Sequence, residues 1–138
     1  MPSGRTHDFI TIFILPILIL ALYYFNISIT TNIIISISYL FSSFMFNGDL
    51  DVPSKPFYRW SFLRFIWLPY QNIPHRSILS HGLIIGTLLR VLYIGIIPII
   101  VLYLLGFDLS ILYCIETLYI LIGLEIGSAI HTIADKIF

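Results

Sequence analysis

The chain's four histidines, together with the acidic residues near them, are the side chains best suited to chemistry in this sequence. Each histidine lies at the edge of an apolar stretch. Imidazole and carboxylate groups together suit a divalent metal: zinc is the first expectation, and manganese or iron also fit. Such an ion activates water and polarises a phosphoryl or carbonyl oxygen. The candidate ligands are His7, Asp49, Asp51, His75, His81, His131 and Asp135.

These residue types leave the number of ions and the individual roles open. Mononuclear zinc with three protein ligands and a water is the simplest arrangement, although the ligand set is large enough for two ions. A carboxylate that stays off the metal, Asp51 or Asp8, would act as catalytic general base, and Arg76 and Ser77 would bind the substrate. Structural roles compete with these: Asp8 at a helix N-terminus, Asp49 in an Asn-Gly turn and Arg76 as a membrane-surface anchor.

The composition places these residues in a membrane protein. The 138 residues are 59% hydrophobic and 10% charged, and their mean hydropathy is +1.00. A soluble domain with so few charges could not cover its apolar surface. The net charge is zero, so the charges are informative only through their positions. The single cysteine excludes a disulfide framework and a cysteine-rich zinc site.

Four apolar stretches predict an all-α fold, an integral membrane four-helix bundle that forms one transmembrane domain over residues 1–138. A hydrocarbon core about 30 Å thick needs about 20 helical residues. Short polar turns join the first stretch to the second and the third to the fourth, so we expect two antiparallel hairpins. The expected helices cover residues 9–25, 27–46, 78–105 and 109–135.

The one long link, between the second and third helices, is rich in aromatic residues. Residues 56–70 interleave these aromatics with Arg59 and Arg64. The pattern predicts an interfacial amphipathic segment in the headgroup layer, with Trp60 and Trp67 among the side chains that enter lipid. Membrane lipid is therefore the expected partner, and so many lipid-seeking residues argue against nucleic-acid binding.

Counting membrane crossings brings all four histidines to one face, together with both termini. His131 and Asp135 also share a helical face because they are four residues apart. The same face carries six basic residues and the two short turns carry none, which predicts that both termini and the metal site are cytoplasmic in the cell membrane. These basic residues are Arg5, Lys55, Arg59, Arg64, Arg76 and Lys136.

Within the apolar stretches, charges and glycines predict how the helices pack. Arg90 and Glu125 lie at similar depth in the third and fourth helices, which predicts an intramembrane ion pair. Two GxxxG motifs predict close packing of the third helix on the fourth, or alternatively contacts of a homodimer or a larger membrane complex. The motifs are Gly82 with Gly86 and Gly123 with Gly127.

Several short motifs resemble a known family. The opening Met-Pro-Ser-Gly-Arg-Thr-His-Asp, the Gly-Asp-Leu-Asp turn, Pro-His-Arg-Ser-x-x-Ser-His-Gly and the closing His-Thr-x-Ala-Asp are similar to the uncharacterised metal-binding membrane proteins of bacteria and archaea. More distantly, they resemble the LexA-binding inner-membrane metal-dependent hydrolases. The resemblance covers nearly the whole chain and implies a metal site at His7, Asp49, Asp51, His75, His81, His131 and Asp135, without implying a substrate.

Two functional hypotheses follow from the sequence. The first is a membrane-embedded metal-dependent hydrolase that acts at the cytoplasmic leaflet on a phosphoester or a lipid headgroup. The second is a non-catalytic membrane subunit of a larger complex, in which the metal or polar cluster is structural. An open coordination position with a groove toward lipid favours the enzyme, whereas a closed four-ligand site favours the subunit.

Overall fold

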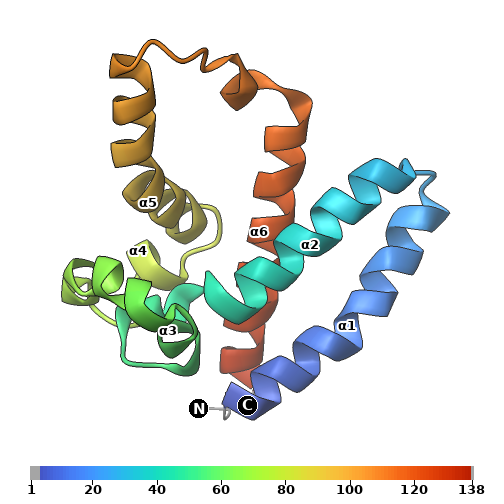
Figure 1. Ribbon diagram of the computed structural model, residues 1–138. Coiled ribbons are helices and arrows are strands. Elements are labelled where there is room, and N and C mark those ends of the chain that lie inside the picture. Colours follow the sequence, from blue (N-terminus) through green and yellow to red (C-terminus); the bar gives the residue numbers. More distant parts are fainter. Residues whose placement is uncertain (1–3, 138) are drawn as a thin grey trace.

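The computed structural model describes residues 4–137, so the residues Met-Pro-Ser of the opening motif and the final Phe138 lie outside the described part of the chain. The described residues form helices and no strand, as expected for an all-α fold (Figure 1). The long helices are α1 (Gly4–Tyr24), α2 (Ile29–Met45), α5 (Ile85–Leu104) and α6 (Ile115–Ile137). The short ones are η1 (Gly48–Asp51), α3 (Lys55–Arg59), η2 (Ser61–Trp67), η3 (Pro69–Asn72), α4 (Ile78–His81) and η4 (Ser110–Tyr113), where η denotes a 3-10 helix.

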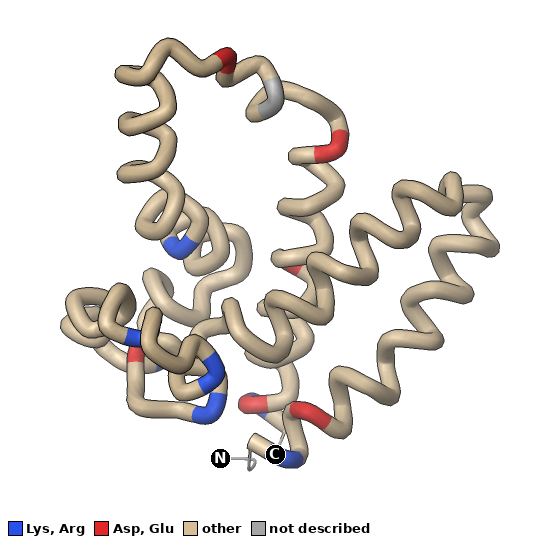
Figure 2. The backbone as a smooth tube through the Cα atoms, in the orientation of Figure 1, with Lys and Arg blue, Asp and Glu red and all other residues tan. Residues whose placement is uncertain are grey.

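Four helical segments are long and apolar enough to cross a membrane, as the hydropathy pattern predicts. They are α1, Ile29–Asp51 (α2 continued through η1), α5 and α6. α5, for example, has 20 residues and is therefore about 30 Å long. Both ends of the described chain lie at one end of the molecule, and the turns after α1 and before α6 lie at the other (Figure 1). Most of the Lys and Arg positions along the backbone lie toward the end that holds the termini (Figure 2).

The closest helix packing joins α6 to α2, rather than the two C-terminal helices as expected. A Cβ atom on Gly123 would lie 2.5 Å from the Ile35 carbonyl oxygen, and one on Gly127 would lie 2.7 Å from that of Tyr39. The second GxxxG motif therefore lets α6 approach the backbone of α2. The Ser42 hydroxyl also donates to the Leu124 carbonyl at 2.6 Å. By contrast, α5 makes few contacts with α6 and stands apart from it for much of its length (Figure 1).

The expected helix over residues 78–105 is divided into α4 and α5. α4 ends at Gly82, and Ile84 has φ +64°, a left-handed conformation that is unusual for a β-branched residue. A Cβ on Gly86 would lie 2.8 Å from the Ser80 carbonyl oxygen, so the first GxxxG motif serves this tight local bend instead of helix pairing. The bend directs the start of α5 away from the line of α4.

The bend also replaces the predicted ion pair between Arg90 and Glu125. The Ile84 N–H donates to the Glu125 carboxylate at 2.9 Å, because the bend frees this backbone donor from the helix. The Arg90 guanidinium instead donates to the Ser80 carbonyl at 2.6 Å and to the Ser128 hydroxyl at 2.7 Å. Arg90 and Glu125 therefore each form hydrogen bonds with other groups instead of with one another.

The aromatic link forms three short helices, α3, η2 and η3, rather than one amphipathic helix. Ser61 interrupts it with φ +51°, and this turns part of the segment inward. Trp67 is fully buried in a cluster with Phe46 and Tyr70. The prediction that it enters lipid is therefore wrong. Burial also raises the pKa of the Tyr70 phenol above its ordinary value, so this hydroxyl keeps its proton. Phe62, on the outer side of the segment, is 78% exposed.

Candidate metal centre

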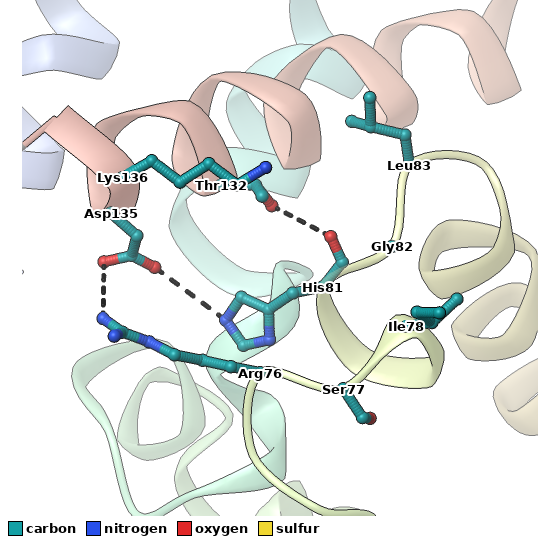
Figure 3. A pocket seen from close by; sticks show the side chains of 9 residues that line it. All are labelled: Arg76, Ser77, Ile78, His81, Gly82, Leu83, Thr132, Asp135 and Lys136. Atoms are coloured by element: carbon teal, nitrogen blue, oxygen red, sulfur yellow. Dashed lines mark hydrogen bonds and ion pairs between the residues drawn. The ribbon is translucent and has the colours of Figure 1, made fainter.

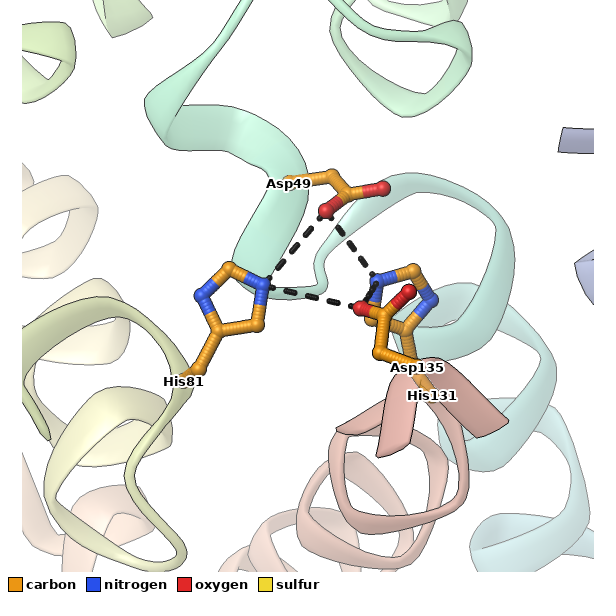
Figure 4. Close-up of side chains that lie close together, drawn as sticks. All are labelled: Asp49, His81, His131 and Asp135. Atoms are coloured by element: carbon orange, nitrogen blue, oxygen red, sulfur yellow. Dashed lines mark ion pairs between the residues drawn. The ribbon is translucent and has the colours of Figure 1, made fainter. Parts of the chain in front are cut away.

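Four side chains from three elements meet at the end of the molecule that holds the termini. Asp49 comes from η1, His81 ends α4, and His131 and Asp135 lie one turn apart on α6 (Figure 4). His81 Nε2 and His131 Nε2 lie 3.4 Å and 3.3 Å from Asp49 Oδ1. The same two nitrogens lie 3.8 Å and 3.5 Å from Asp135 Oδ2. The spacing of four residues between His131 and Asp135 places both on one face, as the sequence predicts.

Three of these four separations match the edges of a tetrahedral metal site, and the fourth, His81 Nε2 to Asp135 Oδ2, is slightly longer at 3.8 Å. For tetrahedral ligands at about 2.0–2.2 Å from a zinc ion, neighbouring ligand atoms are about 3.3–3.6 Å apart. The four atoms are buried and make no hydrogen bond in the described structure, which would be costly for bare polar groups. Two imidazoles and two carboxylates also balance the charge of a divalent ion. The cluster therefore fits zinc, manganese or iron.

A tight turn after α2 positions Asp49. The Asn47 side chain accepts a hydrogen bond from the Asp49 N–H at 3.1 Å and donates to the Ser43 carbonyl at 2.8 Å. Ser54 then donates to the Asp49 carbonyl at 2.6 Å. Gly48 lets the His81 ring approach, because a Cβ here would lie 2.8 Å from His81 Nε2. The Asn-Gly pair was visible in the sequence as a turn, but its contact with His81 was not.

His81 is oriented from its other ring nitrogen and from its backbone. Ser80 Oγ lies 3.0 Å from His81 Nδ1, so an Nδ1–H can donate to Ser80 while Nε2 faces the cluster. The Arg90 guanidinium donates to the Ser80 carbonyl, and the Thr132 hydroxyl donates to the His81 carbonyl at 3.4 Å. The sequence marked Arg90 as an intramembrane charge but did not connect it to the metal ligands.

His7 joins the cluster from the first turns of α1. Its ring lies 4.2 Å from that of His131, measured between centroids, and its Nε2 lies 3.3 Å from Asp135 Oδ1. His7 is therefore beside the four-ligand set and contacts the carboxylate oxygen of Asp135 that faces away from His81. The structure brings it to the end of the molecule where the crossing count places it.

Asp51 and His75 form a neighbouring pair rather than part of the four-ligand set. His75 Nδ1 lies 2.8 Å from Asp51 Oδ1, a hydrogen-bond distance, and His81 Nδ1 lies 3.8 Å from Asp51 Oδ2. The Asp51 side chain is fully buried, whereas that of His75 is 31% exposed. These two residues and His81 form a second group that could hold an ion, although the short Asp51–His75 separation is that of a hydrogen bond.

Asp8 is directed away from the four-ligand set. It pairs with Lys55 and accepts two hydrogen bonds from Arg59 Nη2, at 2.9 Å and 2.8 Å. Arg59 also donates to the Phe44 carbonyl at 3.0 Å, which ties α1 and α3 to the end of α2. Asp8 thus has a structural role in joining the N-terminal helix to the aromatic segment.

The candidate substrate residues lie at the edge of the cluster. Arg76 Nη2 is 3.8 Å from Asp135 Oδ1, and Ser77 Oγ is 3.4 Å from Ser80 Oγ. Both line a cavity of about 290 Å³ whose floor includes His81 and Asp135 (Figure 3). Asp49 and His131 line a second cavity of about 200 Å³. Each of the two cavities therefore adjoins two residues of the buried ligand set.

Comparisons with known proteins agree with a metal centre. Residues 2–115 match the family described as "Uncharacterized metal-binding protein (DUF2227)". The match ends at the first residue of α6 and so does not include the two candidate ligands of that helix. An uncharacterized protein of Aquifex aeolicus (strain VF5) is 37% identical over 59 residues, which is 42% of this chain and 42% of that protein. The similarity thus spans about two-fifths of the length of this curated relative. No solved structure matches the chain.

Proposed function

The chain belongs to this family of uncharacterized metal-binding proteins, and on that premise we propose that it is a membrane-embedded metal-dependent hydrolase. Its substrate would be a phosphoester or a lipid headgroup at the cytoplasmic leaflet. The observation that carries the proposal is a group of four buried ligand atoms that make no hydrogen bond, next to a cavity lined by two basic side chains. The resemblance to the LexA-binding hydrolases adds support from sequence motifs alone.

The proposed chemistry divides between the ion and the chain. A divalent ion bound by Asp49, His81, His131 and Asp135 would supply Lewis-acid polarisation of a phosphoryl oxygen and a water of lowered pKa. Overall, a water oxygen bonds to phosphorus, the ester P–O bond breaks, and the alcohol leaves with a proton. Arg76, at the rim, is placed to bind the phosphoryl oxygens.

Proton transfer in this proposal involves the pair of Asp51 and His75. Asp51 is buried and lies within hydrogen-bond distance of His75 Nδ1, and the partly exposed His75 ring would carry the proton between this carboxylate and the reactant. Asp8, the other candidate base, is paired with Lys55 and Arg59 and is poorly placed to accept a proton. The pairing therefore favours Asp51 over Asp8 in the catalytic role.

One observation favours the alternative function, a non-catalytic membrane subunit with a structural metal. Asp49, His81, His131 and Asp135 could fill all four positions of a tetrahedral site, whereas catalytic zinc usually keeps one position for water. The flanking cavities argue for the enzyme, because a purely structural site has no need of access. Under either function, partners such as membrane lipid, a second copy of the chain or a larger complex are proposals.

The proposed location is the cell membrane, with both termini and the metal centre on the cytoplasmic side. Four helices of sufficient length and apolar character support a membrane location. The concentration of Lys and Arg positions toward the end that holds the termini supports this orientation under the positive-inside rule (Figure 2).

Metal analysis of the purified full-length protein tests the shared site. We expect His81→Ala combined with His131→Ala to lower the bound metal to the background level, because it removes both imidazoles of the four-ligand set. Asp108→Asn, in the remote turn before α6, is the matched control and should retain the metal. Unchanged metal content in the double variant would exclude this centre.

Activity then separates the two functions. We expect the metal-loaded protein to hydrolyse a chromogenic phosphoester, and Arg76→Gln to reduce kcat/KM without changing the metal content. Stoichiometric metal with no hydrolysis of phosphoesters or phospholipids, in the presence of zinc, manganese or iron, would favour the structural subunit.

A further inference from the structure

The cavity beside the metal centre has two chemically different sides. Its floor is formed by His81 and Asp135, and its polar rim carries Arg76 and Lys136. The opposite side carries Ile78, the first residue of α4, and Leu83, in the bend between α4 and α5 (Figure 3). A ligand seated there would meet cations at one end and aliphatic side chains at the other.

The polar rim is suited to a phosphate group. Among the described residues that line the cavity, Asp135 is the one acidic side chain, and it is directed toward His81 and Arg76 (Figure 3). The separation of 3.8 Å between Arg76 Nη2 and Asp135 Oδ1 is longer than a charge-assisted hydrogen bond, so the guanidinium keeps donors for a further anion. The amine of Lys136 extends along α6 past Thr132, on the other side of the opening (Figure 3).

The backbone at Arg76 supports a positioning role for this side chain. Its φ of +59° is left-handed, which is uncommon for a residue with a Cβ and costs conformational energy. Pro74 precedes it by two residues, and the Ser77 N–H donates back to the Pro74 carbonyl at 3.1 Å, so a tight turn holds this conformation. The turn brings the guanidinium within 3.8 Å of Asp135 while the side chain stays 48% exposed, so it remains open to a ligand.

The apolar side continues beyond the cavity. Ile78 is 69% exposed and Leu83 is 58% exposed, and Ile84, the next residue, is 62% exposed. These side chains lead directly into α5, whose outer surface is apolar along its length. If α5 crosses a membrane as proposed, the cavity opens at the boundary between phosphate-rich headgroups and hydrocarbon. A fully soluble ligand would gain nothing from this aliphatic border.

We propose that the cavity binds a phosphorylated lipid with a terminal phosphate. The phosphate would lie between Arg76 and Lys136, next to the metal centre, and the first part of an acyl chain would lie along Ile78 and Leu83. A terminal phosphate carries close to two negative charges at neutral pH, which matches two basic side chains. This inference deepens the proposed hydrolase, and rests on it for the metal centre, by naming the substrate class.

Binding measurements with a non-hydrolysable probe test the proposal. The zinc-loaded full-length protein in neutral detergent is titrated with a dioctanoylglycerol methylenephosphonate and, separately, with glycerol 3-phosphate. We expect the lipid probe to bind at least tenfold more tightly. We expect Arg76→Gln combined with Lys136→Gln to weaken both ligands at least tenfold, and Leu83→Asn to weaken only the lipid probe, by severalfold.

The matched control is Arg64→Gln. Arg64 belongs to the aromatic segment, where its guanidinium lies 5.7 Å from the centroid of the Tyr58 ring, and it does not line the cavity. It should bind both ligands as the unchanged protein does. An equal loss for Arg64→Gln and the double variant would show non-specific attraction of anions and would overturn the site. Equal affinity for the lipid probe and glycerol 3-phosphate would overturn the lipid assignment.

The outcome also separates this inference from the proposed hydrolase. Specific binding of the probe together with an absence of hydrolysis would support the lipid site and refute the enzyme. Zinc-dependent hydrolysis of soluble phosphoesters that Arg76→Gln reduces, together with equal affinity for the lipid probe and glycerol 3-phosphate, would support the enzyme and refute the lipid site. Zinc content is measured for every variant, so that a loss of binding is assigned to the cavity only where the metal is retained.

Discussion

Gly48→Ala should weaken metal binding although it removes no ligand. A Cβ on residue 48 would lie 2.8 Å from both Cδ2 and Nε2 of His81, whereas ordinary van der Waals contacts begin at 3.4 Å. The imidazole must therefore withdraw by about 0.6 Å or more, while metal–ligand distances tolerate only about 0.2 Å. We expect the affinity for zinc to fall about 10- to 100-fold, which corresponds to about 1.4–2.7 kcal/mol. This is the loss typical of removing a group that orients a metal ligand.

The assay is competition for zinc between the purified protein and a chromogenic chelator, supported by direct metal analysis. Gly95→Ala is the matched control, because its Cβ would meet only Ile99 Cδ1, at an ordinary 3.6 Å. Helix content by circular dichroism should be the same for both variants and the unchanged protein. A zinc affinity of Gly48→Ala within twofold of the unchanged protein would refute the close approach of His81 to this turn, and with it the assigned ligand geometry.

Three further outcomes are expected. Gly123→Ala should lower the free energy of unfolding by about 1–3 kcal/mol, because its Cβ would lie 2.5 Å from the Ile35 carbonyl oxygen and push α6 away from α2. Thermal denaturation measures this loss, and a stability equal to that of Gly95→Ala would contradict the packing. Arg90→Met should lower both stability and zinc affinity, because the Ser80 carbonyl loses its buried donor at about 1–3 kcal/mol and the adjacent ligand loses its support. Unaltered zinc affinity in that variant would show that Arg90 does not position the ligand. Lys55→Cys in a cysteine-free background should resist an impermeant maleimide in intact cells, and labelling from outside would reverse the proposed orientation.

Much of the architecture was predictable because it depends on local properties. The length and apolar character of the stretches predicted four long helices, and the short turns predicted that alternate helix ends lie together. That ordering brings His7, Asp49, His81 and His131 to one end, as the structure has them. The turn signal at Asn47 was equally local, since an Asn-Gly pair favours a turn whatever surrounds it.

The errors arose where a contact between distant segments determined the local conformation. The residues that follow Gly82 are apolar, so their hydropathy gave no sign of a bend whose freed Ile84 N–H donates to Glu125. Trp67 is of a residue type that favours the membrane interface, but Phe46 and Tyr70 bury it. GxxxG spacing marks a surface that allows close approach without naming the helix that approaches it.

By itself, the sequence determined the all-helical class, the four apolar helices and the side chains able to hold a metal, because hydropathy, length and ligand chemistry belong to single residues and short stretches. Only the tertiary structure decided that Asp49, His81, His131 and Asp135 form one ligand set, that Asp51 pairs with His75, and that Asp8 faces Lys55 and Arg59. Ligand geometry at the scale of a few tenths of an ångström depends on how separate helices pack, and no local pattern encodes that.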